Sequence, residues 1–389
     1  MTVDFQNFER AFIAKTDNDL HRAYQLFDLM GNQVVNKILT TATRFSFSIG
    51  LPIGPLVRVT VFDQFCGGTH LSDCDEAVMS LGSHGVSTCL DYSVEAKKTN
   101  EGFDQTVEEL IRMVEYARHN PHVSFVVVKP TAIAPLHLME KISNKQALDP
   151  AEKIDWDRVK SRLRKVADVV SDNQQRLFID AEDSWYQPCV DQFALELMQE
   201  YNKKSAIIFN TLQFYRWDRL EYLLNLIDHA RTEGFKLGLK NVRGAYMEKE
   251  RSRASNRGYN SPIQNDKEST DRDYDLAVKT CMNNLDVVNF CAATHNAESL
   301  QKLIQQMREK NLTNNDNRIW MSQLYGMGDN LSFNLAAEGY NVCKYLPYGP
   351  VNDIIPYLMR RAEENSSIAG QMGREQMMIY QEMRRRGLV

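Results

Sequence analysis

Two adjacent arginines near the C-terminal end of the chain are the side chains whose spacing most clearly suggests chemistry. In the segment KYLPYGPVNDIIPYLMRRAEENSS, one stripe at helical spacing is apolar and consists of Ile354, Ile355, Leu358 and Ala362. The stripe beside it is polar and consists of Tyr357, Arg360, Arg361 and Glu364. Guanidinium groups bind carboxylates through paired hydrogen bonds, so the polar stripe predicts an anion-binding edge on a core-packed helix. We expect Asp353 to cap this helix and Pro356 to lie in its first turn.

Other polar side chains occupy one repeated position, at or just beyond eight short apolar runs. They are Asp91, Glu95, Lys129, Asp180, Glu182, Gln213, Tyr215, Arg243, Thr294, His295, Gln323 and Tyr345. If the runs are the parallel strands of a barrel, all these side chains lie at its C-terminal mouth, where barrel enzymes build their active sites. The pattern therefore predicts a functional mouth.

The elements that must position these side chains are eight strand-then-helix units. The apolar runs are GVSTCLDYSVE, VSFVVVKPT, RLFIDAED, SAIIFNTLQFY, GFKLGLKNVRGAY, LDVVNFCAATHN, RIWMSQLYGMG and YNVCKYLPYG. Amphipathic segments such as TVEELIRMVEYARHN separate them. Such units predict an α/β fold with a closed (βα)8 barrel, and an open doubly wound sheet is the alternative. We expect the barrel domain at residues 85–370, after a helical arm at 1–84 and before a C-terminal helix at 371–389.

The composition argues against several classes of protein. The chain has 389 residues, 43% hydrophobic and 25% charged, with a net charge of −5 and a pI of about 6.0, which argues against a nucleic-acid binder with a basic surface. No window approaches the ~18 apolar residues of a membrane span. The opening MTVDFQNFERAFIAKTDNDL resembles neither a secretory signal nor a transit peptide, so we expect a cytoplasmic protein.

The seven cysteines are an odd number without a pairing pattern, which favours reduced thiols. Cys66, His70 and Cys74 recur at four-residue intervals, a spacing that could suggest a metal. However, glycines follow Cys66 and no fourth ligand is in view. The sequence therefore predicts no metal site.

Several motifs in this sequence resemble a known family. They are DYSVE, FIDAED, VRGAYMEKER, ATHNAES, QLYGMGDN and KYLPYGPVNDIIPYLMRRAEENSS. Over roughly residues 60–370 and in this order, they are similar to the motif series of the proline dehydrogenase family. The resemblance implies a distorted barrel whose last helix sits over the mouth, with FAD bound there. The segment GMGDNL lacks the third glycine of a G-x-G-x-x-G fingerprint, which agrees with an FAD site that is not of the Rossmann type.

The same resemblance implies a reaction. The enzyme would oxidise L-proline to 1-pyrroline-5-carboxylate, the first step of proline catabolism, by hydride transfer from proline C5 to flavin N5. Electrons would then pass to a quinone. The residues implied to be catalytic are Lys129, Asp180 and Lys240, with Asp180 orienting Lys129.

For substrate binding, the resemblance implies that Arg360 and Arg361 hold the proline carboxylate and that Lys129 lies near it. Glu95 would pair with Arg360 as a gate over the site. Two buried arginines repel each other unless balanced, and Glu364, one turn beyond Arg360, offers further compensation. The pocket for the proline ring would contain Tyr345, Tyr357, Leu324 and Tyr246.

For cofactor binding, the implied residues are Ala181, Gln213, Lys240, Val242, Arg243, Gly244, Ala245, Thr294, His295 and Asn296. Lys240 would present a cation to flavin N5, where many bacterial relatives carry arginine. The resemblance also implies that Arg243, Gly244 and Ala245 approach the pyrophosphate, arginine for its charge and glycine and alanine for close access of the backbone.

Alternatives remain open at this point. A hydroxyproline dehydrogenase is one, although Tyr345 favours unsubstituted proline. A Schiff-base enzyme using Lys129 and a catalytically silent barrel are others. The ending REQMMIYQEMRRRGLV is amphipathic, which suits either peripheral contact with an anionic membrane or a solvated helix end.

Overall fold

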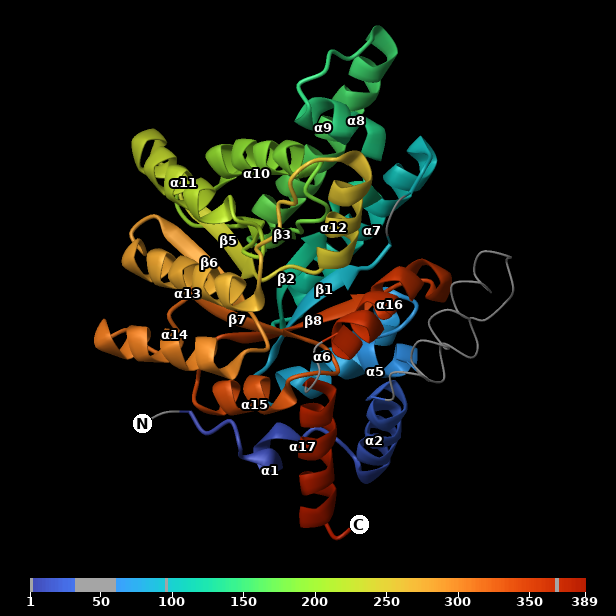
Figure 1. Ribbon diagram of the computed structural model, residues 1–389, viewed down its shortest axis with the longest axis vertical. Helices are drawn as coiled ribbons and strands as arrows, with labels where there is room; N and C mark the ends of the chain where they lie inside the picture. Colours follow the sequence, from blue (N-terminus) through green and yellow to red (C-terminus); the bar gives the residue numbers. More distant parts are fainter. Residues whose placement is uncertain (1–2, 32–60, 95–96, 368–370) are drawn as a thin grey trace.

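Parallel strands close into a barrel in which each strand pairs with its neighbours along the chain and β1 pairs with β8 (Figure 1). The computed structural model describes residues 3–31, 61–94, 97–367 and 371–389. The strands are β1 (Ser87–Tyr92), β2 (Val123–Val128), β3 (Leu177–Ile179), β4 (Ile208–Gln213), β5 (Leu237–Val242), β6 (Val288–Ala293), β7 (Ile319–Leu324) and β8 (Val342–Tyr348). Each lies inside one predicted run, so the closed (βα)8 barrel is confirmed and the open sheet is wrong.

Packed side chains fill the inside of the barrel. Because side chains alternate along a strand, Cys89 belongs to the inner cluster while Leu90 packs with the surrounding core. Inside, the rings of Phe125 and Phe178 stack with centroids 4.1 Å apart, and Phe209 packs edge-on against both. This aromatic layer forms a rigid floor beneath the polar side chains of the mouth.

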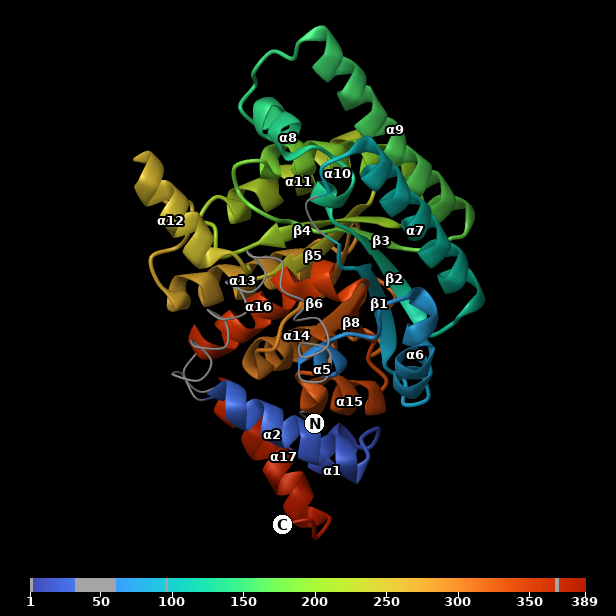
Figure 2. The ribbon, with the colours of Figure 1, turned by 90° about the vertical axis from the view of Figure 1, so that its right-hand side faces the viewer.

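Helices cover the outside of the barrel (Figures 1 and 2). They are α7 (Asn100–His119), α9 (Pro150–Asp172), α10 (Gln187–Tyr201), α11 (Arg219–Glu233), α13 (Lys267–Asn283), α14 (Ala297–Glu309) and α15 (Asp329–Ala337). The last barrel helix, α16 (Val351–Ser367), lies at the mouth of the barrel. Two units carry additional pieces: η3 (Pro130–Ala132) and α8 (Leu136–Ser143) follow β2, and α12 (Met247–Arg257) follows β5. Arg253 of α12 forms an ion pair with Glu140 of α8, and this contact links the two additional helices.

The helix α16, which carries the paired arginines, begins earlier than predicted. It starts at Val351, and the backbone N–H groups of Asp353 and Ile354 donate to the carbonyl of Pro350. Asp353 therefore lies inside the first turn and does not cap the helix; its carboxylate accepts a hydrogen bond from Lys97 at 3.2 Å. The prediction that Pro356 lies in the first turn is also wrong. Because the helix starts at Val351, Pro356 lies inside it, beyond the first turn.

The chain ends pack together beside the barrel. Before β1 come α1 (Phe8–Ala11), α2 (Asp17–Gly31), α5 (Asp63–Phe65), η2 (Leu71–Cys74) and α6 (Asp75–Gly82). The C-terminal α17 (Gln371–Arg385) lies alongside α2, and Gln376 of α17 donates to Asp28 of α2 (Figures 1 and 2). Glu375 of α17 also accepts a hydrogen bond from the backbone of Gly328, which ties α17 to the turn after β7.

Within the described ranges, no helix combines the length and apolar content needed to cross a bilayer. The seven cysteines are free thiols, and all are buried. Among the described residues, no three His, Cys, Asp or Glu side chains are placed to share a metal ion. The candidate triplet is split, because Cys74 lies in the core while the His70 side chain is 79% exposed.

Candidate active site

A cavity of about 310 Å³ lies at the C-terminal ends of the strands. Its walls contain the predicted residues Lys129, Asp180, Ala181, Gln213, Lys240, Val242, Arg243, Gly244, Ala245, Tyr246, Thr294, His295, Asn296, Leu324, Tyr345, Tyr357, Arg360 and Arg361. The structure thus brings together side chains from seven strands' ends and from α16, although they are spread over more than 230 residues of sequence. The predicted gate residue Glu95 and the side chain of Glu364 fall outside the part of the chain that the structure describes.

A chain of hydrogen bonds links the charged groups at the centre of this cavity. Lys129 Nζ donates to the hydroxyl of Tyr345 at 3.1 Å, and that hydroxyl donates to Asp180 Oδ2 at 2.9 Å. The other carboxylate oxygen of Asp180 accepts from Lys240 Nζ at 2.6 Å. Lys240 also lies over the ring of Tyr345, 4.6 Å from its centroid. Side chains from four strand ends are therefore fixed relative to one another.

The direct partner of Lys129 is a residue that the sequence did not single out for this role. Lys129 Nζ lies 2.6 and 2.5 Å from the two carboxylate oxygens of Asp91 on β1. Asp180, which we expected to orient Lys129, pairs with Lys240 instead. Asp180 reaches Lys129 only through the hydroxyl of Tyr345, so the contact between them is indirect, and sequence spacing does not reveal that Asp91 is the direct partner.

The protonation states of the central groups follow from burial and charge. Burial raises the pKa of Asp180, but the charges of Lys240 and Lys129 and the hydrogen bonds to Lys240 and Tyr345 outweigh it, so the pKa lies below its usual value. Burial lowers the pKa of Lys240, but the charge of Asp180 outweighs it and the net shift is upward. Burial, with Asp180 and Asp91, raises the pKa of Tyr345 well above its ordinary range. The centre thus holds a carboxylate, an ammonium group and a neutral phenol.

The paired arginines of α16 face the same cavity. Arg361 is buried, and its guanidinium lies 5.3 Å from the ring centroid of Tyr357. Arg360 lies 5.3 Å from the ring centroid of Tyr246, at the start of α12. The apolar stripe beside them is buried as predicted, with Ile354, Ile355 and Leu358 at most 4% exposed. Packing of this stripe turns the arginines toward the mouth.

Arg243, just past β5, is held by three polar partners. Its guanidinium donates to Asp271 at 2.5 Å, to the hydroxyl of Thr294 at 2.7 Å and to the hydroxyl of Ser299 at 3.0 Å. The next residue, Gly244, has φ of 135°, and a Cβ there would come within 2.5 Å of the Tyr215 ring. Only glycine fits this backbone, which leaves Arg243 at the cavity edge.

His295 is a neutral residue of the cavity wall. Its Nε2 accepts a hydrogen bond from the backbone N–H of Leu324 at 3.1 Å, which assigns the proton to Nδ1. Burial and the charges of Lys344 and Arg361 lower the pKa of His295 to about 3. The side chain of the next residue, Asn296, caps α14 by accepting from the backbone N–H groups of Glu298 and Ser299.

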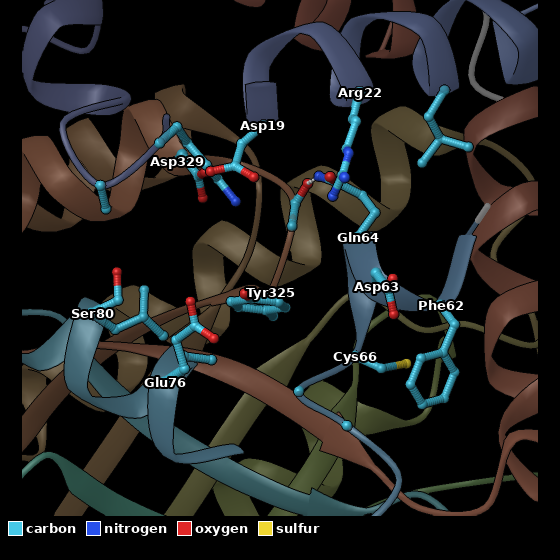
Figure 3. Close-up of a pocket in the computed structure, with 18 of the residues that line it drawn as sticks. Asp19, Arg22, Phe62, Asp63, Gln64, Cys66, Glu76, Ser80, Tyr325 and Asp329 are labelled. Carbon is cyan, nitrogen blue, oxygen red and sulfur yellow. Dashed lines mark hydrogen bonds between the residues drawn. The ribbon is translucent and has the colours of Figure 1, made fainter. Parts of the chain in front are cut away.

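A larger cavity of about 750 Å³ lies between α2, α5, α6 and the turn after β7 (Figure 3). Asp19, Arg22, Glu76 and Tyr325 are among the residues that line it. None of the predicted site residues within the described ranges lines this cavity. We therefore place the candidate active site at the barrel mouth.

Comparison with known protein families shows to which family this chain belongs. A family model described as proline dehydrogenase matches residues 74–374, which is most of the chain. The chain belongs to the proline dehydrogenase family. The resemblance read from the motifs is thus confirmed, and the chain is an oxidoreductase of this family.

Curated relatives support the membership in the proline dehydrogenase family. "Proline dehydrogenase 1, mitochondrial" of Arabidopsis thaliana is 30% identical, over 92% of this chain and 79% of its own length. "Carbapenem antibiotics biosynthesis protein CarD" of Pectobacterium carotovorum subsp. carotovorum is 35% identical over 83% of each chain. "Hydroxyproline dehydrogenase" of Xenopus laevis is 35% identical, over 58% of this chain and 49% of its own length.

Solved structures of proline utilization A share the fold. The structure of that protein from Bdellovibrio bacteriovorus, inactivated by N-propargylglycine, aligns with a TM-score of 0.73 and 19% identity, covering 93% of this chain. This chain spans 38% of the length of that protein. The barrel is thus the fold of a known proline dehydrogenase family structure.

Some cavity residues of this proline dehydrogenase family chain were not predicted as site residues: Thr211, Lys267, Ala293, Ser322 and Gln323. Gln323 was recognised as a strand-end residue without a role. Thr211 precedes Gln213 by two residues and Ser322 precedes Leu324 by two, so the strand period could have found both. Lys267 begins α13 and carried no comparable signal.

Proposed function

We propose that this chain oxidises L-proline to 1-pyrroline-5-carboxylate with bound FAD, as the first step of proline catabolism, and that a quinone accepts the electrons. The observation that carries the proposal is the convergence of Arg360 and Arg361 with the linked side chains of Lys129, Tyr345, Asp180 and Lys240 around one cavity. Anion-binding groups and a fixed, charge-balanced polar centre are what a small zwitterionic substrate requires.

The donor groups of the cavity fit FAD. Lys240, Arg243 and Lys267 are cations on its wall, and cations suit a pyrophosphate and the charge of a reduced flavin. Gln213, whose amide donates to the carbonyl of Glu182 at 2.7 Å, and Ala181 offer uncharged contacts for the ring system. Val242, Gly244, Ala245, Thr294, His295 and Asn296 complete the proposed cofactor wall. When bound, FAD supplies the acceptor at N5 for the hydride from proline C5.

The chain's own residues would bind and orient proline. Arg360 and Arg361 would hold the carboxylate, and Lys129 would lie close to it. Leu324, Tyr246 and Tyr357 would enclose the ring, with Tyr345 over C4. Because the hydroxyl of Tyr345 is held by both Lys129 and Asp180, its ring cannot move aside easily.

This fixed tyrosine bears on the alternatives. A substituent on C4 of the substrate would meet the Tyr345 ring, so we propose that proline is preferred over hydroxyproline, despite the relative from Xenopus laevis named for the latter. A Schiff-base reaction needs a lysine amine that can reach a carbonyl carbon, whereas Lys129 Nζ lies 2.5 Å from the carboxylate of Asp91. The intact set of charged residues argues against a silent barrel.

The quinone step and the cellular location remain proposals. Met377 of α17 is 60% exposed and Tyr380 is 43% exposed, near the exposed Arg384. This face suits peripheral contact with an anionic membrane in which a quinone is dissolved. The relative from Arabidopsis thaliana is described as mitochondrial, and another relative comes from the bacterium Pectobacterium carotovorum subsp. carotovorum. For this chain we propose a cytoplasmic protein with such membrane contact.

The reaction itself is tested by its product. Purified protein incubated with L-proline and a soluble quinone should form a compound with two hydrogens fewer than proline, detected by mass spectrometry. If proline is recovered unchanged while the protein retains its flavin, the proposed function is wrong.

A further inference from the structure

Asp91 is a buried carboxylate next to the cavity but not part of its wall. It lies on β1 two residues after Cys89, so its side chain points to the inside of the barrel. It is 0% exposed. A carboxylate taken entirely out of water is costly unless a positive charge lies against it, so its retention at this position calls for a partner.

That partner is Lys129. The ammonium group lies 2.6 and 2.5 Å from the two oxygens of Asp91, and Lys129 itself is only 5% exposed. Ser93 strengthens the pair, because its hydroxyl donates to Asp91 and lies 3.4 Å from Lys129 Nζ. If the carboxylate is removed, Lys129 Nζ loses its two shortest contacts and its position is no longer fixed.

The charges of the centre come in two pairs. Asp180 pairs with Lys240, and Asp91 pairs with Lys129, while Tyr345 joins the two pairs through its hydroxyl. Asp180 lies directly against Lys240 and reaches Lys129 only through the hydroxyl of Tyr345. Asp91 is therefore the group that balances Lys129.

We propose that Asp91 is a positioning residue for proline binding: it balances the charge of Lys129 and holds its Nζ beside Tyr345 at the cavity wall, so that the substrate carboxylate meets a fixed cation. The inference rests on the proposed function. Asp91 acts through Lys129 and does not touch the substrate itself.

The variant Asp91→Asn removes the charge and keeps the shape. We expect the KM for proline to rise by about tenfold or more at neutral pH, the scale of one lost charge-assisted hydrogen bond, with a smaller change in kcat. The separation of KM from kcat is the readout, because a loss of general stability would lower the amount of active enzyme, and so the apparent kcat, without raising KM.

A double-mutant cycle tests whether Asp91 acts through Lys129. In a Lys129→Met background, Asp91→Asn should change KM by less than about twofold, because the cation that it serves is already gone. The matched control is Asp191→Asn. Asp191 is also buried and pairs with Arg219 at 2.7 Å, but among the described residues it does not line the cavity, so its loss should leave the KM for proline unchanged.

Several results would overturn the inference. One is an unchanged KM in Asp91→Asn; another is an increase in KM of the same size in the Lys129→Met background. If Asp91→Asn does not fold but the double variant does, the buried lysine is the cause and the inference stands. If neither folds, Asp91 supports the barrel independently of Lys129 and the inference fails. A wild-type protein whose flavin is not reduced by proline would instead refute the proposed function.

Discussion

The carboxylate of Asp180 and the ammonium group of Lys240 lie 2.6 Å apart at the mouth of the barrel, with Tyr345 donating to the second carboxylate oxygen. The Lys240 side chain is 8% exposed and that of Asp180 is 13% exposed, so water screens this pair much less than it would a surface pair. The pair joins the end of β3 to β5, and its position decides where a cation faces the proposed flavin.

Replacement of Asp180 by Asn should therefore reduce the activity by more than a loss of protein stability would explain. The variant loses the charge that fixes both Lys240 and Tyr345, and we expect kcat/KM for proline to fall by about tenfold to a hundredfold, from charge-assisted hydrogen bonds worth ~1.5–3 kcal/mol each. Steady-state kinetics on flavin-loaded protein measure this. Asp286→Asn, at a surface carboxylate that is 61% exposed, is the control, and equal losses in the two variants would refute the role of Asp180.

Replacement of Arg361 by Lys should weaken proline binding. Lysine keeps the charge but lacks the planar fork that binds a carboxylate through two hydrogen bonds. We expect the KM for proline to rise by about tenfold with a smaller change in kcat, because a charge-assisted hydrogen bond is lost. Arg385→Lys on α17, at a side chain that is 46% exposed, serves as the control. A KM that stays at the wild-type value would contradict the assignment of Arg361 to the carboxylate.

Replacement of Gly244 by Ala should release the cofactor. The added Cβ would meet the Tyr215 ring at 2.5 Å, and the φ of 135° is itself unfavourable for alanine. The backbone beside Arg243 must then shift, so the flavin content of the purified variant should fall. Gly234→Ala separates strain from the clash, because Gly234 also has a positive φ, 71°, but its Cβ would meet nothing within 4 Å. Full flavin content in Gly244→Ala would show that this turn does not face the cofactor.

The buried His295 should make folding stability depend on pH. Its pKa is lowered to about 3 in the folded state from an ordinary value of 6.5, so the unfolded chain binds a proton that the folded chain refuses. The contribution of His295 to the free energy of unfolding is fully present above pH 6.5. It falls as the pH drops, by up to about 2 kcal/mol between pH 6.5 and 5. Urea unfolding of wild type and His295→Asn should show a difference in free energy of unfolding that narrows on acidification.

The variant is needed for this measurement, because a second group, Glu375, changes the folding stability with pH in the opposite direction. Burial raises the pKa of Glu375 to about 7, so stability falls as the pH rises from 4.5 to 7. The two effects partly cancel in the wild type, and only the difference between wild type and His295→Asn isolates the histidine. A difference that stays constant from pH 7.5 to 5 would contradict a neutral buried His295.

The rate of flavin reduction should rise with pH from neutral. Hydride transfer requires proline with a neutral amine, and the central groups are poorly suited to take its proton: the pKa of Asp180 is lowered, while Lys240 and Tyr345 hold their own protons because their pKa values are raised. Single-turnover reduction followed in a stopped-flow instrument measures the rate. A flat pH profile would mean that the amine loses its proton by another route.

The barrel and the members of the cavity were predictable because both follow from strong sequence patterns. Strand alternation and the C-terminal mouth place residues as distant as Lys129 and Tyr345 in one cavity whatever the details of packing. The pairing inside the cavity was not predictable. That Lys129 contacts Asp91 and not Asp180 depends on differences of a few ångströms between strand ends, which composition and spacing do not record.

The start of α16 was predicted too late. Asp353 is a favoured capping residue, but Pro350 already provides a fixed φ three positions before it, and the carbonyl of Pro350 accepts the first hydrogen bonds of the helix. The carboxylate of Asp353 is then free to bind Lys97, which comes from the segment after β1. Long-range contact decided the role of this side chain.

The flavin spectrum of the purified protein under anaerobic conditions tests the central claim most directly. We predict a yellow protein whose absorbance is bleached by L-proline, and much less readily by 4-hydroxyproline because of Tyr345. A protein that binds FAD but keeps its full absorbance after prolonged incubation with L-proline would contradict the account.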